Sequence, residues 1–339
     1  MAERNALLAK LKSMLHHSIA ESTSRSYAVG WNAFKSFANR YGLTIDLPLD
    51  QWSLCLFIAY QIDRVTYNTI KVYLNGIRHF HAQLGYELKF KDMVLFNQLQ
   101  KAYKRLKSDA TATKKLPVTT ALLNKLCPLL DWSSHDDRLF YTICCVGTYG
   151  LLRANEFIND EKPLLWNSLI EISDSAFSLR FSSSKTASLR NGFTVQFFKN
   201  NSPSCPWFML VKMLTKYYPF QLDPKSPIFR RTDGSLAKKA WVISKLQKLL
   251  ETLGFPAHLY TGHSFRKGGA TSLADAGVSD HLIKSMGRWH SWSYQLYIAP
   301  SLQSIREAAR EMGRAGIIFG GFDPSTRMLM NHVSGLGYL

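Results

Sequence analysis

The chain has 339 residues, of which 46% are hydrophobic and 13% aromatic, so it is long enough for two folded domains and too apolar for a disordered protein. Its 42 lysine and arginine residues exceed its 24 acidic residues and give a formal net charge of +18, which favours a polyanionic partner such as nucleic acid. The five cysteines show no Cys-x-x-Cys spacing, which predicts reduced thiols. The sequence has no long apolar run and no apolar signal segment, so we expect no membrane partner and an intracellular location.

Residues 1–107 are predicted to form a helical bundle. Aromatic and small apolar residues recur at helical spacing after Thr23, which is a candidate helix cap, and Gly42 is the expected end of that helix. A second helix is expected to begin at Thr66 or Thr69. The apolar stripes of such helices are more typical of a protein core than of a surface that stacks on bases.

Basic residues on the other faces of the second helix are candidates for contacts with nucleic-acid phosphates. Lys71, Arg78 and His81 occupy such positions, although a solvated basic face is the alternative. The residues that we predict as DNA contacts, here and further along the chain, are Lys71, Arg78, Lys114, Lys115 and Lys267.

Residues 108–118 are predicted to be a linker, because the apolar period disappears and small, polar and basic residues replace it. The excess of basic residues is shared by the segments before and after this linker. Two basic domains joined in this way can close around a DNA duplex as a C-shaped clamp.

Residues 119–314 show a mixed pattern of helices, then short strands, then helices again. The expected strands span 164–172, 176–181 and 193–198. This order predicts an α+β domain with a small antiparallel sheet in a mostly helical protein, rather than a doubly wound parallel sheet. Residues 315–339 are expected to form a loosely ordered tail.

Three charged residues in the middle of the chain are candidates for work on a phosphate. Arg153 in GTYGLLRANEF follows an apolar helix, where rigid structure can hold its planar guanidinium against phosphate oxygens. Glu156 is placed to orient Arg153 or a histidine. Lys185 lies in the loop between two strands, where a lysine can protonate a leaving oxygen as a general acid.

A second group of candidates follows in HSFR and GRWH. His263 and Arg266 open a helix and share one face near its N-terminus, a favourable place for an anion. The indole N–H of Trp289 can donate to a phosphate oxygen, and His290 is a rival donor. Residues 264–287 also resemble a helix-turn-helix, but a role in DNA recognition alone would not explain the phosphate-binding pair His263 and Arg266.

Tyr297 is the candidate nucleophile, on a short helix that Ser291 can cap. Because a tyrosine hydroxyl has a pKa of about 10, its attack on phosphorus needs a base, an acid for the leaving oxygen and fixed cations for the oxygens that gain charge. Tyr294 is the rival nucleophile, since the interval between Trp289 and Tyr297 is compact.

In this order the residues resemble the catalytic set of the tyrosine recombinases, the phage-integrase superfamily. The set is Arg153 in GLLRANEF, Lys185 in the hairpin loop, His263 and Arg266 in HSFR, Trp289 in GRW and Tyr297 in YQLYI. The resemblance covers nearly all of the chain and implies a helical, SAM-like core-binding domain before the catalytic domain. The patterns LLRxxEF, SxRKGGAT and GRWxSxxYxxYI are similar to recombinases of the DIRS-like and Crypton-like mobile elements of eukaryotes, which implies a nuclear location.

The resemblance also implies a mechanism. Tyr297 would form a 3′-phosphotyrosyl bond with double-stranded DNA and release a 5′ hydroxyl, with Arg153 and Arg266 holding the scissile phosphate. Lys185 would protonate the leaving oxygen, and His263 would help to move the phenolic proton. The implied protein needs no metal or other cofactor, and it acts as a dimer on one site and a tetramer in synapsis.

Other activities remain open from the sequence. A type IB topoisomerase shares the chemistry but relaxes supercoils without a second DNA site. A non-catalytic DNA-binding protein of the same fold is expected to have lost part of the set, which is complete here. A metal-dependent nuclease is disfavoured, because the sequence has no carboxylate cluster with ligand spacing.

Overall fold

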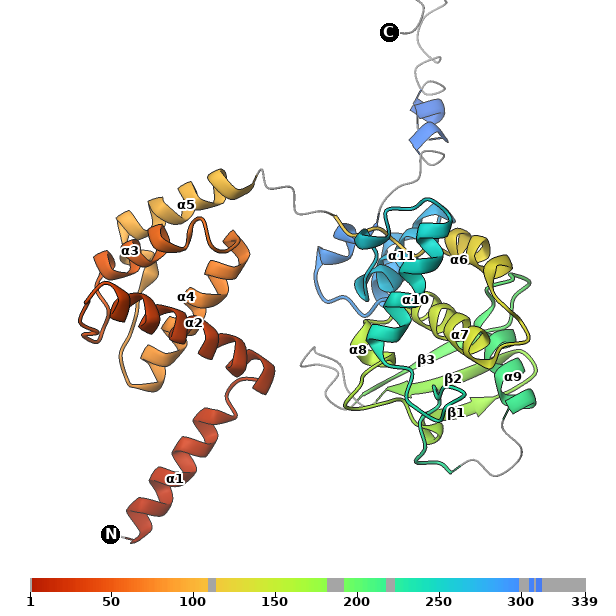
Figure 1. Cartoon of the computed structure of the whole chain (residues 1–339), viewed down its shortest axis with the longest axis horizontal. Helices are drawn as coiled ribbons and strands as arrows, with labels where there is room; N and C mark the ends of the chain where they lie inside the picture. The colour runs from red at the N-terminus through yellow and green to blue at the C-terminus, as the bar shows by residue number, and fades with distance from the viewer. Residues whose placement is uncertain are drawn as a thin grey trace, which may run out of the picture. The chain divides into compact units, whose positions relative to one another are not determined.

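The computed structural model describes residues 2–108, 114–181, 192–217, 223–298, 305–307 and 309–312. The chain divides into two compact units, Met1–Thr113 (unit 1) and Lys114–Leu339 (unit 2), shown in Figure 1. Part of the predicted linker (109–113) and the predicted tail (315–339) lie outside the described residues.

Unit 1 is helical, as the sequence predicts. Its helices are α1 (Ala2–His16), α2 (Glu21–Arg40), α3 (Gln51–Gln61), α4 (Tyr67–Gln83) and α5 (Val94–Ser108), with a 3-10 turn η1 (Phe90–Asp92) before α5. Their apolar stripes meet in a core that includes Phe34, Phe57, Ile70, Leu74, Ile77 and Phe96. Two glycines allow α2 and α4 to approach closely: a Cβ on Gly30 would lie 2.5 Å from the Cα of Tyr73, and one on Gly76 would lie 2.4 Å from the backbone oxygen of Tyr27.

The helix ends in unit 1 confirm some of the predicted caps and correct others. Thr66 caps α4, because its hydroxyl accepts a hydrogen bond from the backbone N–H of Thr69 at 3.2 Å. The prediction that Thr23 caps α2 is wrong: the helix begins at Glu21, and the N–H of Thr23 already donates to the backbone oxygen of Ala20. Gly42, with φ 63°, follows the end of α2 as expected.

His81 does not face solvent, so the prediction that it could meet DNA is wrong. Its side chain is fully buried, and its Nε2 accepts the backbone N–H of Leu49 at 3.1 Å while Nδ1 bonds the backbone oxygen of Ile77 at 2.7 Å. The ring therefore fixes the loop before α3 against α4. Periodicity alone did not reveal this, because the loop that covers His81 comes from a distant segment.

Unit 2 combines helices with an antiparallel sheet. In chain order its elements are α6 (Thr120–Leu126), η2 (Cys127–Leu129), α7 (His135–Tyr149), α8 (Ala154–Phe157), η3 (Trp166–Ser168), β1 (Leu169–Ile172), β2 (Ala176–Phe181), β3 (Phe193–Phe198), α9 (Pro206–Tyr217), α10 (Lys239–Thr252), η5 (Ala257–Leu259), α11 (His263–Asp275), α12 (Asp280–Met286) and η6 (Trp292–Leu296). The strand order is β1-β2-β3, with Ala176 opposite Phe198 and Phe181 opposite Phe193. The predicted fold class, mostly helical with a small antiparallel sheet, is confirmed.

One strand boundary in unit 2 differs from the sequence expectation. The first strand was expected from residue 164, but residues 166–168 form a 3-10 turn and pairing with β2 begins only at Leu169. Helix α10 begins at Lys239, after an isolated β-bridge that joins Arg230 and Leu236.

The core of unit 2 surrounds α7, which contacts α6, α9 and α11 and buries almost its whole length. One face of the sheet covers this core with Phe177, Leu179 and Phe197. Residues 114–118, placed in the linker by the sequence, join unit 2: the N–H of Val118 donates to the backbone oxygen of Ser264 at 2.9 Å, and its side chain is fully buried. Within the described residues, no helix is long and apolar enough to cross a membrane.

Candidate active site

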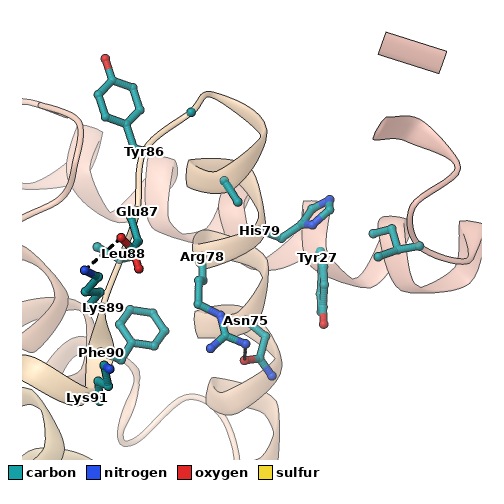
Figure 2. Close-up of a pocket in the computed structure, with 13 residues that line it drawn as sticks. Tyr27, Asn75, Arg78, His79, Tyr86, Glu87, Leu88, Lys89, Phe90 and Lys91 are labelled. Carbon is teal, nitrogen blue, oxygen red and sulfur yellow. Dashed lines mark hydrogen bonds and ion pairs between the residues drawn. The ribbon is translucent and has the colours of Figure 1, made fainter. Parts of the chain in front are cut away.

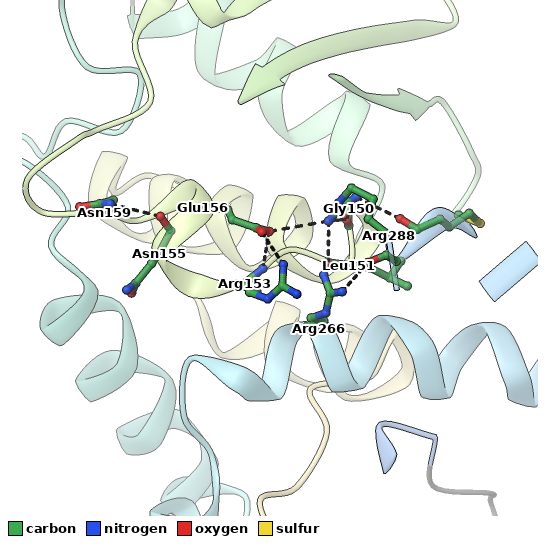
Figure 3. A network of polar contacts seen from close by, with 10 residues as sticks. Gly150, Leu151, Arg153, Asn155, Glu156, Asn159, Arg266 and Arg288 are labelled. Carbon is green, nitrogen blue, oxygen red and sulfur yellow. Dashed lines mark hydrogen bonds and ion pairs between the residues drawn. The ribbon is translucent and has the colours of Figure 1, made fainter. Parts of the chain in front are cut away.

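Arg153 and Glu156 lie at the start of α8 and hold each other. The backbone N–H of Arg153 donates to Oε2 of Glu156 at 2.8 Å, and the Arg153 Nη1 pairs with Oε1 at 2.8 Å. The Glu156 side chain is only 5% exposed, whereas that of Arg153 is 26% exposed. Arg153 therefore keeps access to solvent while a buried carboxylate sets its direction (Figure 3).

Arg266 projects from α11 toward the same place. Its side chain is fully buried, its Nη1 donates to the backbone oxygen of Leu151 at 2.7 Å, and its Nη2 donates to the backbone oxygen of Gly287. Its Nε is buried without a hydrogen-bond partner among the described residues. Two carbonyls hold this buried guanidinium, and one of its N–H donors stays unused within the described part of the chain. Such an arrangement is typical of an anion-binding site.

Arg288 is a third arginine at this site, and it is not among the residues predicted from the sequence. Its Nη2 lies 3.7 Å from Oε2 of Glu156, and it also donates to the backbone oxygen of Leu151 at 3.1 Å. Figure 3 shows Arg153, Arg266 and Arg288 gathered around Glu156 and the turn at Gly150 and Leu151. The sequence feature that could have identified Arg288 as a site residue is its position directly after Gly287, which ends α12.

The charges around Glu156 do not balance, because three guanidiniums surround one carboxylate. Burial, then the nearby charges of Arg153 and Arg288, lower the pKa of Arg266 to about 9. Burial also lowers the pKa of Arg288 to about 10, against the opposing effect of Glu156. This excess of buried positive charge favours an anionic ligand.

Trp289 and Tyr297 lie beside Arg266. The Arg266 guanidinium carbon is 4.1 Å from the centroid of the Trp289 ring and 5.9 Å from that of Tyr297. The Trp289 and Tyr297 rings are 5.4 Å apart, and Trp289 is 7% exposed while Tyr297 is half-buried. Tyr297 directly follows η6, for which Ser291 provides the expected cap by accepting from the N–H of Ser293. The structure thus brings together Arg153, Glu156, Arg266, Trp289 and Tyr297.

Tyr294 occupies a different environment. Its side chain is fully buried, and its hydroxyl donates to Oδ2 of Asp280 at 2.9 Å. The phenol thereby joins η6 to the first residue of α12. This is the environment of a packing residue rather than of an accessible nucleophile.

The remaining predicted catalytic residues are placed as follows. His263 is the first residue of α11 and is exposed, one helical turn before Arg266. His290 is also exposed. Lys185 lies outside the described residues, in the segment between β2 and β3. In the described parts of the chain, no group of histidine, cysteine and acidic residues is arranged to hold a metal ion.

The predicted DNA contacts of unit 1 are exposed on α4. Lys71 lies 5.8 Å from the centroid of the Tyr67 ring. Arg78 lines a cavity of about 810 Å³ (Figure 2), together with Lys89 and Lys91. This cavity presents cations to solvent, which fits contact with a polyanion.

The predicted DNA contacts of unit 2 lie close to one another. Lys267 donates to the backbone oxygen of Lys115 at 2.8 Å, and Lys115 donates to the backbone oxygen of His258 at 3.3 Å. Burial, and then the charge of the exposed Lys114, lower the pKa of Lys267. Mutual repulsion of this kind is relieved when an anion binds.

No protein-family profile matches the sequence. The chain is 25% identical over 298 residues to an integrase/recombinase XerD homolog of Selenomonas ruminantium, and the match covers 83% of this chain and 82% of the relative. Among solved structures, the XerH site-specific recombinase bound to palindromic difH is similar with a TM-score of 0.59, 15% identity, and coverage of 84% of this chain and 78% of that one. The Tn1549 transposon integrase in complex with circular intermediate DNA gives a TM-score of 0.56, 14% identity, and coverage of 88% and 97%.

The fold is that of the DNA-recombining enzymes that use a tyrosine, and it extends over most of the chain. The chain thus has the fold of the tyrosine recombinases (integrases) and is similar in sequence to an integrase/recombinase over most of its length, as the sequence resemblance indicated. The narrower likeness to recombinases of DIRS-like and Crypton-like elements, and with it the nuclear location, stays a prediction.

Proposed function

We propose that this protein is a site-specific DNA recombinase of a mobile element that cuts and rejoins strands through a covalent bond between Tyr297 and a 3′ phosphate of DNA. The observation that carries the proposal is the position of Tyr297 beside the buried guanidinium of Arg266, which among the described residues has an unused N–H donor for an anion. The Tyr297 ring lies 5.9 Å from the Arg266 guanidinium carbon, within a site where two further arginines, Arg153 and Arg288, share the Glu156 carboxylate. A phosphate that enters this site would meet both fixed cations and a phenol.

The proposed step exchanges one phosphate ester for another. The Tyr297 oxygen forms a bond to phosphorus, the bond from phosphorus to the 5′ oxygen breaks, and that oxygen leaves with a proton. The reverse attack by a 5′ hydroxyl releases Tyr297 and reseals a strand. Since a diester is present before and after each step, the exchange needs no oxidant, reductant or nucleotide.

Each side chain of the site has a proposed part in this step. Arg153 and Arg266 hold the non-bridging oxygens, which gain negative charge in the transition state. Lys185 protonates the leaving oxygen, and His263, exposed at the start of α11, takes part in moving the phenolic proton. Trp289 was expected to donate to phosphate; its ring lies beneath Arg266, so we propose that it also supports that guanidinium.

Double-stranded DNA is the proposed partner. Of the proteins that share the fold, the Tn1549 integrase is described in complex with circular intermediate DNA and the XerH site-specific recombinase as bound to palindromic difH substrate. The net charge of +18 and the exposed lysines and arginines of both units support the same partner here. We also propose that two copies occupy one site and four copies exchange strands between two sites.

The proposal is tested with a nicked suicide substrate, from which the small leaving fragment diffuses away so that a covalent adduct accumulates. Wild-type protein should yield an adduct on denaturing gels, and mass spectrometry should place the nucleotide on Tyr297. Tyr297→Phe should yield none, whereas Tyr294→Phe should still react. An adduct that persists in Tyr297→Phe and disappears in Tyr294→Phe would contradict the assigned nucleophile. DNA binding without any adduct from wild-type protein would leave a non-catalytic DNA-binding protein, and relaxation of a plasmid without exchange between two sites would indicate a topoisomerase.

A further inference from the structure

Two strained turns meet at the Arg266 guanidinium. Among the described residues, Leu151 (φ 48°) and Arg288 (φ 56°) are the non-glycine residues with positive φ. Leu151 follows α7, and its backbone oxygen accepts from Nη1 of Arg266. Arg288 follows α12, and the residue before it, Gly287, accepts from Nη2. Left-handed backbone at residues with side chains is uncommon and is concentrated at functional sites.

The side chain of Arg288 joins these two turns directly. Its Nη1 donates to the backbone oxygen of Met286 at 3.0 Å, within its own turn. Across the site, both terminal nitrogens lie 3.3 Å from the backbone oxygen of Gly150, and Nη2 lies 3.1 Å from that of Leu151. The Leu151 oxygen therefore accepts from Arg266 and Arg288 together, as Figure 3 shows.

Arg288 also reaches two other parts of the site. Its Nη2 lies 3.7 Å from the Glu156 carboxylate, which in turn binds Arg153. Its guanidinium carbon lies 4.4 Å from the centroid of the Phe193 ring, at the first residue of β3. One side chain that is only 13% exposed thus contacts groups that hold both Arg153 and Arg266.

We propose that Arg288 is a positioning residue: its guanidinium fixes the two turns whose carbonyls hold Arg266, and the carboxylate that holds Arg153. The inference rests on the proposed function and adds to it a residue outside the predicted catalytic set. A glycine would adopt the same backbone without strain, so the arginine must contribute through its side chain. A lysine would keep the charge but, with a single nitrogen, could not span the same acceptors.

The first test measures single-turnover cleavage of the suicide substrate by Arg288→Gly and Arg288→Lys. Displacement of the phosphate-binding arginines should slow adduct formation about 100-fold in both variants. The affinity for uncleaved DNA should change less than about 3-fold, because few of the many phosphate contacts depend on this site. Arg230→Gly, which removes an equal charge from an exposed position in unit 2, is the matched control and should cleave at the wild-type rate.

A neutral methylphosphonate at the scissile position separates positioning from general damage to the fold. Because this linkage gains less charge during attack, it depends less on Arg266, and the defect of both variants should shrink by at least about 10-fold relative to the ordinary phosphodiester. Equal defects on the two substrates would assign Arg288 a merely structural role. Cleavage within about 3-fold of wild type by either variant would overturn the inference.

Calorimetric titration with inorganic phosphate tests the same geometry without any cleavage, and Arg266→Gln defines the background from other cations. Both Arg288 variants should bind phosphate at this site at least about 10-fold more weakly than wild type, which converts to about 1.4 kcal/mol. Equal affinity would overturn the inference. If wild-type protein binds phosphate but forms no adduct with DNA, the proposed function fails, and the titration still decides the role of Arg288.

Discussion

The Arg266 guanidinium lies 4.1 Å from the centroid of the Trp289 ring, and both side chains are buried. Contact of a cation with the face of an indole stabilises by about 2 kcal/mol when the pair is removed from water. The indole thus offsets part of the unfavourable burial of a charge, and its ring centroid also lies 5.4 Å from that of Tyr297. One aromatic ring therefore links the anion-binding arginine to the proposed nucleophile.

Replacing Trp289 with alanine should destabilise unit 2 and slow cleavage. Loss of a large buried aromatic side chain is expected to lower the free energy of unfolding by about 3 kcal/mol, whereas Trp289→Phe should lower it by about 1 kcal/mol because most of the ring contact remains. The free energy of unfolding of unit 2 is measured from the hydrogen exchange of α11 amides at increasing urea concentration. Trp292→Ala is the control: its side chain is 66% exposed, and a change of no more than about 0.5 kcal/mol is expected. Equal effects of the two alanine substitutions would contradict the proposed support of Arg266.

Glu156→Gln should make the site dependent on an added anion. The substitution leaves Arg153 and Arg288 without their carboxylate, which should lower the free energy of unfolding by about 3 kcal/mol at low salt. Phosphate should then raise the melting temperature of the variant more than that of wild type, since it replaces the missing charge. Thermal unfolding at increasing phosphate concentration measures both effects, with exposed Glu161→Gln as the control. A variant as stable as wild type without phosphate would show that the carboxylate is not needed.

Unit 1 should lose stability as the pH falls below 6.5, because of His81. Burial lowers the pKa of this histidine from its ordinary 6.5, although its bond to the Ile77 carbonyl partly opposes the shift. Since the folded-state pKa is below the unfolded one, the unfolded chain binds more protons between the two values. The stability contributed by neutral His81 is therefore complete above pH 6.5 and is lost as the pH falls through the folded-state pKa.

Hydrogen exchange of the Leu49 amide, which donates to His81 Nε2, follows this change in the full chain. Exchange, corrected for its intrinsic pH dependence, should accelerate from pH 7 to pH 5 in wild type. His81→Asn should be less stable throughout but show a smaller pH dependence, while the exposed His258→Asn should retain the wild-type dependence. An unchanged pH dependence in His81→Asn would contradict the prediction.

DNA binding should weaken steeply with salt, and single lysines should contribute measurable parts of that dependence. Each lysine that binds a phosphate is expected to add about 1 to the slope of log affinity against log salt, so Lys114→Ala and Lys71→Ala should each reduce the slope by that amount. Equilibrium binding at several salt concentrations measures the slopes. Lys225→Ala, which removes an exposed lysine outside the predicted DNA-binding residues, should leave the slope unchanged. Binding that is insensitive to salt would contradict a phosphate-dominated interface.

Local patterns in the sequence were sufficient for many of the elements that carry the site. The strands Ala176–Phe181 and Phe193–Phe198 and the helix that begins at His263 agree with their expected ranges, because alternation, helical spacing and terminal glycines act over a few residues. Boundaries that depend on a partner were less predictable. The first strand is shorter than expected, since only Leu169–Ile172 finds a register with β2.

The sequence by itself determined the charge, the order of the chemistry-bearing residues and the position of Glu156 three residues after Arg153, while the structure decided that the two side chains pair. Only the tertiary structure decided which tyrosine is sequestered by Asp280, that His81 is covered by a distant loop, and that Arg288 belongs to the site. The physical reason is that burial and hydrogen-bond acceptors come from remote segments: the carbonyls that hold Arg266 lie 115 and 21 residues away in the chain. No local sequence pattern predicts these contacts, because they form only when the turns after α7 and α12 pack against α11.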